Sequence, residues 1–255
     1  MSRLRVCRSN VVFTCTAIVM TSGCSTESTE SVNIATPAIW VNIDIDAVQT
    51  GSTRVNVELN VGGANGTNIE LSTNERLEAT LGSVTKVLQK DTDLFDIDYV
   101  AHFSTSSSAQ PVRIAFFRAD GSIHDNTVVG LPDEFLVTSP QAGQTFASSS
   151  TIPIAWTPFR NGRMINIDLF ASCATLTGSS FGGPSIAVAD DGFENYDLGN
   201  HSVINAVDID RSKPCGLIIR VYRVESGTLD PAFEAGGTIE AVQSREVDNI
   251  TVTLQ

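Results

Sequence analysis

The stretch IWVNIDIDAVQTGSTRVNVELNV, residues 39–61, decides the fold class of this chain. Apolar and polar residues alternate over 39–46 and again over 54–61, on either side of the turn sequence VQTGST. A period of two places the apolar side chains on one face of an extended strand and the polar side chains on the other. The stretch therefore predicts two half-buried antiparallel strands joined by a turn.

Further strand-like segments follow at the short spacing that is typical of a β-sandwich. Clusters of Gly, Asn, Asp and Ser separate these segments, which are 75–81, 84–88, 95–103, 112–118 and 127–131. A long apolar pattern with helical period is absent from the sequence. We therefore predict an all-β chain with almost no helix.

A second start lies at residues 131–158, LPDEFLVTSPQAGQTFASSSTIPIAWTP. Pro, Gly and Ser interrupt the strand pattern there, and Ile152, Ile154 and Trp156 then alternate again. The stretch resembles the opening of immunoglobulin-like and fibronectin-III-like modules of bacterial surface proteins, which read SP-x-x-G and then a strand ending in Trp. The resemblance implies a two-sheet sandwich with Trp156 in its core, and it implies no particular activity. We expect two tandem antiparallel Ig-like sandwiches, residues 37–133 and 134–255.

Two cysteines, Cys173 and Cys215, fall within the second sandwich. Each lies on the apolar side of an alternating segment, 165–173 or 215–221. In an exported protein an even pair of cysteines is typical of a disulfide. We therefore predict a buried, structural disulfide between them.

The first 23 residues have the layout of a bacterial secretory signal. Arginines at positions 3, 5 and 8 precede the apolar run 11–20. This run of ten residues is too short to span a bilayer core, which needs roughly 20. We therefore predict a signal peptide over residues 1–23.

The sequence TSGC, residues 21–24, resembles the lipobox of bacterial lipoproteins, and the resemblance implies that Cys24 is lipidated and becomes the new N-terminus. Thr21 departs from the pattern, because an aliphatic residue is normal at that position. The alternative is an ordinary signal peptide that leaves Cys24 as a free thiol. The polar run STESTES after Cys24 predicts a flexible tether over residues 24–36.

The chain is acidic, with 16 basic and 29 acidic residues and a net charge of −13. Removal of the signal would make it more acidic still. This balance disfavours nucleic acid and anionic lipid as partners, because both need basic patches. Membrane attachment would come from the acyl chains on Cys24. Ser25 after Cys24, in place of Asp, fits sorting to an outer membrane by resemblance to lipoprotein sorting rules. Both orientations of the domains, toward the periplasm or toward the cell surface, stay possible.

Acidic residues gather in the segment DTDLFDIDYVAHF, residues 91–103. Their carboxylates could hold a calcium ion, with the ligands Asp91, Asp93, Asp96 and Asp98. The spacing is not that of a calcium loop, and a solvated strand face is the favoured interpretation. A second acidic segment contains Asp190, Asp191, Glu194 and Asp197. A calcium loop or a surface connector would explain it, and the connector is favoured.

Trp40 is the aromatic residue with the best pattern for an exposed ligand contact. By parity it shares the polar face of its strand with Asn42, Asp44 and Asp46. A flat indole ring on an exposed face can cover the apolar side of a sugar. The alternative, which is favoured, is that Trp40 packs under a loop or against the second sandwich.

Common catalytic signatures are missing from the sequence. It has three histidines, and it contains no His-Glu-x-x-His, Gly-x-Ser-x-Gly or phosphate-binding glycine loop. We therefore predict a non-catalytic envelope protein with a binding, adhesion or structural role, whose partner is a protein or a glycan. The alternative is an enzyme or accessory protein acting on polysaccharide, with Asp96 and Asp98 as its carboxylates.

Overall fold

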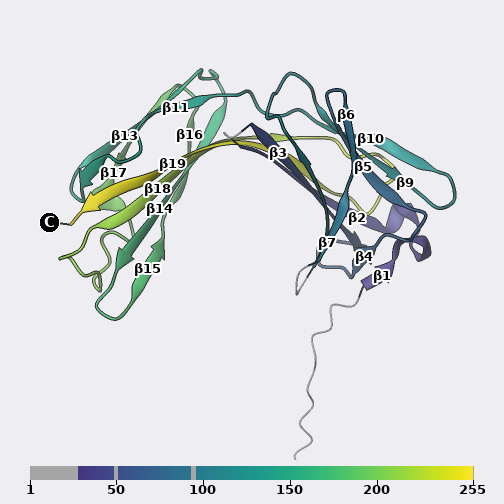
Figure 1. Ribbon diagram of the computed structural model, residues 1–255, viewed down its shortest axis with the longest axis horizontal. Helices are drawn as coiled ribbons and strands as arrows, with labels where there is room; N and C mark the ends of the chain where they lie inside the picture. The colour runs from purple at the N-terminus through teal and green to yellow at the C-terminus, as the bar shows by residue number, and fades with distance from the viewer. Residues whose placement is uncertain (1–27, 49–50, 93–95, 255) are drawn as a thin grey trace, which may run out of the picture.

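The computed structural model describes residues 28–48, 51–92 and 96–254, and Figure 1 shows the arrangement of their strands. The predicted signal peptide and Cys24 lie outside the described residues. The strands, in chain order, are β1 (Ser28–Glu30), β2 (Ile39–Val48), β3 (Ser52–Val61), β4 (Asn68–Glu70), β5 (Arg76–Leu81), β6 (Val84–Val87), β7 (Gln89–Thr92), β8 (Ile97–Phe103), β9 (Val112–Phe117), β10 (Ile123–Val129), β11 (Leu136–Ser139), β12 (Thr145–Ala147), β13 (Thr151–Thr157), β14 (Met164–Ala174), β15 (Ser179–Gly182), β16 (Ser185–Ala189), β17 (Phe193–Asp197), β18 (Cys215–Ser226) and β19 (Gly237–Thr253).

The prediction of an all-β fold is confirmed. Helical structure in the described residues consists of three single 3-10 turns, η1 (Ser31–Asn33), η2 (Thr36–Ala38) and η3 (Leu198–Asn200). Within the same residues, no helix has the length and apolar character needed to cross a membrane.

One large sheet runs through the whole molecule. Its main path is β1-β4-β3-β2-β19-β18-β14-β15, and β8, β7, β16 and β12 add to it at the sides. Two smaller sheets, β10-β9-β5-β6 and β11-β13-β17, pack on it at opposite ends. We call the sandwich with the four-stranded sheet the first lobe and the sandwich with the three-stranded sheet the second lobe. Figure 1 shows that the large sheet curves into an arch with both smaller sheets on its outer side, so that its other face is concave.

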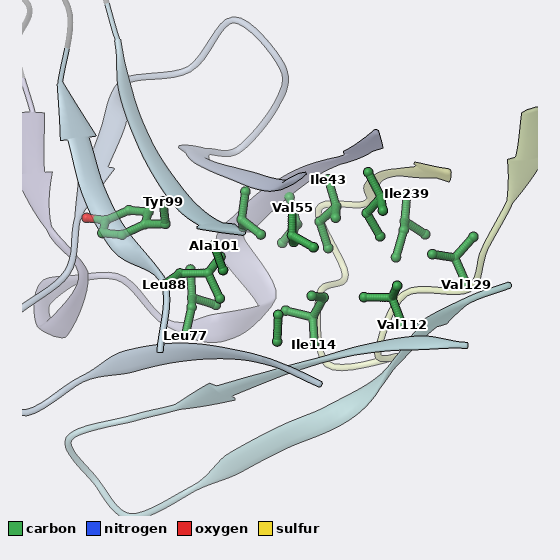
Figure 2. Close-up of a cluster of buried hydrophobic side chains, with 14 of the residues drawn as sticks. Ile43, Val55, Leu77, Leu88, Tyr99, Ala101, Val112, Ile114, Val129 and Ile239 are labelled. Atoms are coloured by element: carbon green, nitrogen blue, oxygen red, sulfur yellow. The ribbon is translucent and has the colours of Figure 1, made fainter. Parts of the chain in front are cut away.

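Each lobe has its own apolar core. Alternation on β2 and β3 turns Ile43 and Val55 inward, where they meet Leu77 and Ile114 from the four-stranded sheet (Figure 2). In the second core Trp156 is buried, as predicted. The predicted disulfide Cys173–Cys215 is also confirmed, and it joins β14 to β18 on the core side.

Strand β19 corrects the expectation of two consecutive sandwiches divided at residue 133. Its residues 237–244 pair in parallel with residues 41–48 of β2 in the first lobe. Its residues 240–252 also pair with β18, which belongs to the second lobe. Phe233 and Ile239 accordingly lie in the first core. The chain enters the second lobe after residue 133 and returns near its end to complete the first.

The segment 28–36 corrects the predicted extent of the tether. Strand β1 pairs with β4, and Ser31 is fully buried. The Arg118 guanidinium forms an ion pair with Glu75 (Nε to Oε1, 2.8 Å) and donates to the carbonyl oxygens of Ser31 and Ile34 at 2.9 and 2.8 Å. These contacts attach residues 28–36 to the first lobe, so a tether can occupy only residues before 28.

A polar seam separates the two cores at the junction of the lobes. On the core-facing side of β19, Ile239 and Ala241 are followed by Gln243 and Arg245, which are buried as well. Arg223 lies opposite Gln243 on β18. Its guanidinium donates to both carboxylate oxygens of Asp190, at 2.8 and 3.0 Å.

Asp190 is therefore not the surface connector residue that the sequence predicted. Its side chain is fully buried, and Trp156 Nε1 also donates to it at 2.8 Å. Burial alone would raise the pKa of Asp190, but the hydrogen bonds from Arg223 and Trp156 and the charge of Arg223 outweigh burial and hold the pKa below its ordinary value. The remaining residues of that acidic segment, Asp191, Glu194 and Asp197, keep exposed or half-exposed positions.

Candidate functional site

The concave face of the first lobe carries ordered rows of polar side chains. Strand register sets these rows, because residues opposite one another on neighbouring strands point to the same face. In one row Asp98 of β8 lies opposite Glu58 of β3, which lies opposite Asn42 of β2. In the next row Asn56 lies opposite Asp44. We call this surface the polar ladder, which consists of Asn42, Asp44, Asn56, Glu58, Asn60 and Asp98.

Within the polar ladder, amides donate to carboxylates. Asn56 Nδ2 donates to Asp98 Oδ1 at 3.1 Å, and Asn42 Nδ2 donates to Asp44 Oδ2 at 3.2 Å. Asn60 Nδ2 donates to Glu58 Oε1. Carboxylates only accept hydrogen bonds, whereas amides both donate and accept. Asn60 is buried, and the more exposed part of the ladder, with the amides of Asn42 and Asn56, offers donors and acceptors side by side.

The charge on the polar ladder is strongly negative. Burial raises the pKa of Glu58, and the neighbouring carboxylates of Asp96, Asp98 and Asp44 raise it further against the lowering effect of Asn60. Burial and the charge of Asp46 likewise raise the pKa of Asp44, although Asn42 and Arg54 oppose them. A further negative group placed here would add to this repulsion.

Trp40 lies at one end of the polar ladder, opposite Asn60. The ring is half-buried on the outward side of β2. One ring edge packs over Gly236, where an added Cβ would come within 3.3 Å of Cζ3. Trp40 thus combines the two positions that the sequence left open, a partly exposed face and packing against a loop. Its contact with a ligand stays a prediction.

A hollow of about 430 Å³ continues the concave face beyond Asp98. It lies along β7 and β8, and outward side chains of both strands, such as Gln89, Val100 and His102, line it. The Lys86 ammonium closes one side by donating to the His102 carbonyl oxygen at 2.5 Å. The polar face of the first lobe is therefore wider than the ladder itself.

The calcium site predicted near residue 91 stays a prediction. Asp91 lies opposite Asp98 in the pairing of β7 with β8, and the Asp96 side chain accepts from the Ile97 amide at 2.8 Å. Asp93 lies outside the described residues. In the part of the chain that the structure describes, no group of three or more His, Cys, Asp or Glu side chains is placed to hold a metal ion.

The second lobe carries an apolar hollow on the same concave face, which the sequence analysis missed. The Phe170 and Phe181 rings stack there, with centroids 5.9 Å apart and planes 8° from parallel. The hollow beside them has a volume of about 240 Å³. Its lining, the aromatic pocket, consists of Phe170, Ser172, Phe181, Pro214, Cys215, Gly216, Leu217, Ile218, Asn249, Ile250 and Thr251.

Parity alone could have indicated the aromatic pocket. Ile165, Ile167 and Leu169 face the core, so Phe170 on the same strand must face outward. An outward phenylalanine on a strand face that is otherwise mostly polar is the sequence signal for this pocket.

Comparisons with known proteins do not assign a family. No protein-family model and no curated protein matches this chain. Among solved structures, the chain is similar to the fibronectin(III)-like modules of Clostridium thermocellum CbhA, with 13% identity over 84% of this chain and 94% of that chain and a TM-score of 0.24. It is also similar to SGBP-B of the Bacteroides ovatus mixed-linkage glucan utilization locus, solved with a mixed-linkage heptasaccharide, with 12% identity over 80% of this chain and 55% of that chain and a TM-score of 0.20. Scores this low support no functional argument, so the assignment as an all-β sandwich protein rests on the strands described above.

Proposed function

We propose that this chain is a lipid-anchored protein of the bacterial cell envelope that binds a neutral glycan without altering it, through the concave face of its large sheet. The observation that carries the proposal is the polar ladder with Trp40 at its end. Sugar hydroxyls both donate and accept hydrogen bonds, and the ladder offers both kinds of partner. The indole ring of Trp40 can cover the apolar side of a sugar ring.

The negative charge of the polar ladder supports a neutral ligand. Burial raises the pKa values of Glu58 and Asp44, and neighbouring carboxylates raise them further. An anionic glycan would bring further negative charge beside them, and its binding would be opposed. A neutral glycan meets no such penalty.

The open position of the polar ladder supports binding without turnover. Enzymes that cleave glycosidic bonds place two carboxyl groups on either side of the scissile bond, one as the acid and the other as base or nucleophile. The ladder instead lies across β2, β3 and β8, three neighbouring strands of one sheet face. The alternative is an enzyme or accessory protein acting on polysaccharide, with Asp96 and Asp98 as its carboxylates. The raised pKa of Glu58, which lies opposite Asp98, would suit an acid in such a site, and the experiment below includes product analysis for that reason.

The proposal is tested by affinity electrophoresis of the purified protein in gels that contain a soluble polysaccharide. The probes are hydroxyethylcellulose, galactomannan, arabinoxylan and amylopectin as neutral polymers, with polygalacturonate as the anionic comparison. We expect retardation by at least one neutral polymer and none by polygalacturonate. Glu58→Ala should weaken the interaction about tenfold, as expected for the loss of a hydrogen-bonding group in a binding site.

The matched control is Glu194→Ala, which removes a half-exposed carboxylate on β17, in the three-stranded sheet on the outer side of the arch. This variant should migrate like the wild type. Free migration of the wild type through all four neutral polymers would refute the proposal. Release of reducing ends from any of them would favour the enzyme instead.

A further inference from the structure

We propose that the aromatic pocket of the second lobe is a stacking subsite for one neutral sugar ring, a site separate from the polar ladder. This inference rests on the proposed function, because the ring bound in the aromatic pocket would belong to the same glycan that contacts the polar ladder. The two places belong to one continuous face. Ser244 of β19 lies between Val48 of β2 and Tyr222 of β18, and the same register continues to Asn166 of β14.

The floor of the pocket is a flat apolar surface. Phe181 of β15 lies opposite Ser172, and Phe170 lies opposite Ile218 of β18. The Phe181 side chain is 68% exposed even though its ring stacks on Phe170. Exposing so much aromatic surface to water is unfavourable, and a ligand that covers it would gain the free energy of its burial.

Gly216 creates the space above this floor. It is the second residue of β18 and pairs with Ser172 of β14 and Thr251 of β19, and a glycine within a sheet often marks close approach of another group. Among the described atoms, a Cβ added at Gly216 would meet only the Ser172 carbonyl oxygen within 4 Å, at 4.0 Å. The hollow therefore exists because no side chain projects from Gly216.

The rim of the pocket is polar and uncharged. Ser172 and Thr251 contribute hydroxyl groups, and Asn249 contributes an amide. Asn249 has a φ of 55°, in the left-handed region that Asn tolerates better than most residues. It sits where the register of β19 with β18 shifts between Leu217 and Ile219, and such bulges redirect a side chain.

An apolar floor with a neutral hydroxyl and amide rim matches one chemical class. Every lining residue in the described part of the chain is uncharged, although the chain has a net charge of −13. A sugar ring has an apolar face that can lie on Phe181 and hydroxyl groups at its edge that can reach Ser172, Asn249 and Thr251. The volume of about 240 Å³ lies below the roughly 300 to 1,000 Å³ of sites for larger ligands, so one ring is the fitting occupant.

Two opposite variants test the inference in the full chain. Phe181→Ala removes the floor, and Gly216→Leu fills the hollow without leaving a cavity. The matched control is Phe193→Ala, which removes an exposed phenylalanine from β17 on the outer side of the arch. Dissociation constants are measured by calorimetry and affinity electrophoresis with the same four neutral polymers, and thermal melting checks that each variant folds.

We expect Phe181→Ala and Gly216→Leu each to weaken binding at least about fivefold, and Phe193→Ala to change nothing. Wild-type binding by both pocket variants, with weakened binding by Glu58→Ala, would overturn the subsite and leave the proposed function intact. If the wild type binds none of the polymers, both proposals fall. If Phe193→Ala weakened binding to the same extent, the subsite would also be overturned, because the loss of an exposed ring far from the pocket would then have the same effect.

Discussion

His201 shows how one buried side chain shapes the second lobe. The ring is completely buried, Nε2 lies 3.1 Å from the Leu169 carbonyl oxygen, and the Ile204 amide donates to Nδ1 at 3.4 Å. A neutral imidazole with its proton on Nε2 satisfies both contacts at once. Burial lowers the pKa of His201, against the raising effect of the backbone hydrogen bonds. The side chain is therefore neutral in the folded protein at neutral pH.

This neutral state gives a pH prediction. In the unfolded chain His201 takes up a proton below about pH 6.5, whereas the folded protein resists protonation, so its contribution to stability falls as the pH drops below that value. His201→Leu should cost about 2 kcal/mol at pH 7.5, because it leaves a buried carbonyl and a buried amide without partners. Urea unfolding should show this difference from the wild type shrinking by pH 5. A difference that stays constant with pH would contradict the prediction, and His102→Leu, at an exposed position, serves as the control.

At the scale of elements, the polar seam connects β18 to the loop before β17. Arg223 and Asp190 both have fully buried side chains, and Arg223 also donates to the carbonyl oxygens of Asp133 and Pro158 at 3.0 and 2.6 Å. Arg223 thus connects β18 to three other segments, the loop at Asp190, the turn at Pro158 and the connection between the lobes at Asp133. Without Arg223 the buried Asp190 carboxylate keeps the more distant ion pair with Arg160 (Nε to Oδ2, 3.5 Å), and breaking a buried pair in this way is far more costly than removing both partners.

Chemical denaturation of three variants tests the seam. Arg223→Met should lower the free energy of unfolding by about 3 to 5 kcal/mol, because Asp190 stays buried without its main partner. Asp190→Leu should cost a similar amount. The double variant should be less destabilised than the sum of the two single variants, which is the signature of a direct interaction. Additive losses would show that the two residues act independently.

Elements also differ in how far the sequence predicted them. The alternation over 39–61 predicted β2 and β3 almost to the residue, because local period fixes a half-buried strand. Strand β19 was not predicted, because its core-facing positions include Gln243 and Arg245 and its partner β2 lies some two hundred residues earlier. Local pattern contains no information on a pairing over that separation.

In the candidate site, too, the features set by local alternation were predicted and those set by distant contacts were not. Parity placed Trp40, Asp44 and Asp98 on the outward face, and the register brings the strands that carry them together. The buried position of Asp190 was missed, because Arg223 lies 33 residues away in the sequence and reaches Asp190 only in the folded lobe. A side chain with a distant partner looks like a surface residue when its neighbours in the sequence are acidic.

At the scale of the whole molecule, the short distance from Cys24 to β1 bears on the membrane. Only residues 25–27 separate Cys24 from Ser28 of β1. A fully extended chain spans at most about 3.6 Å per residue, so acyl chains on Cys24 would hold the first lobe within roughly 15 Å of the bilayer. The lobe would stand directly on the membrane and not at the end of a long tether.

Palmitate labelling in a bacterial host tests this attachment. We expect the wild type to be labelled and to sediment with membranes, and Cys24→Ser to be unlabelled and released. Cys15→Ser is the matched control and should behave like the wild type, because this residue lies within the predicted signal peptide. Labelling of Cys24→Ser, or release of the unaltered chain, would contradict the prediction.

If the wild type is attached to the membrane, protease treatment of intact and lysed cells establishes which side of the membrane the lobes face.

The return of β19 to β2 also has a consequence for biogenesis. Val41 can pair with its β19 neighbour only after Gly237 has been synthesised, so the first lobe cannot be completed on a chain that ends before that residue. Until then β2 presents a bare hydrogen-bonding edge of the kind that recruits strands from other molecules. A product truncated before residue 237 would keep that edge permanently. Completion of the first lobe thus depends on β19, although this lobe also contains β1 and β2 from the other end of the described chain.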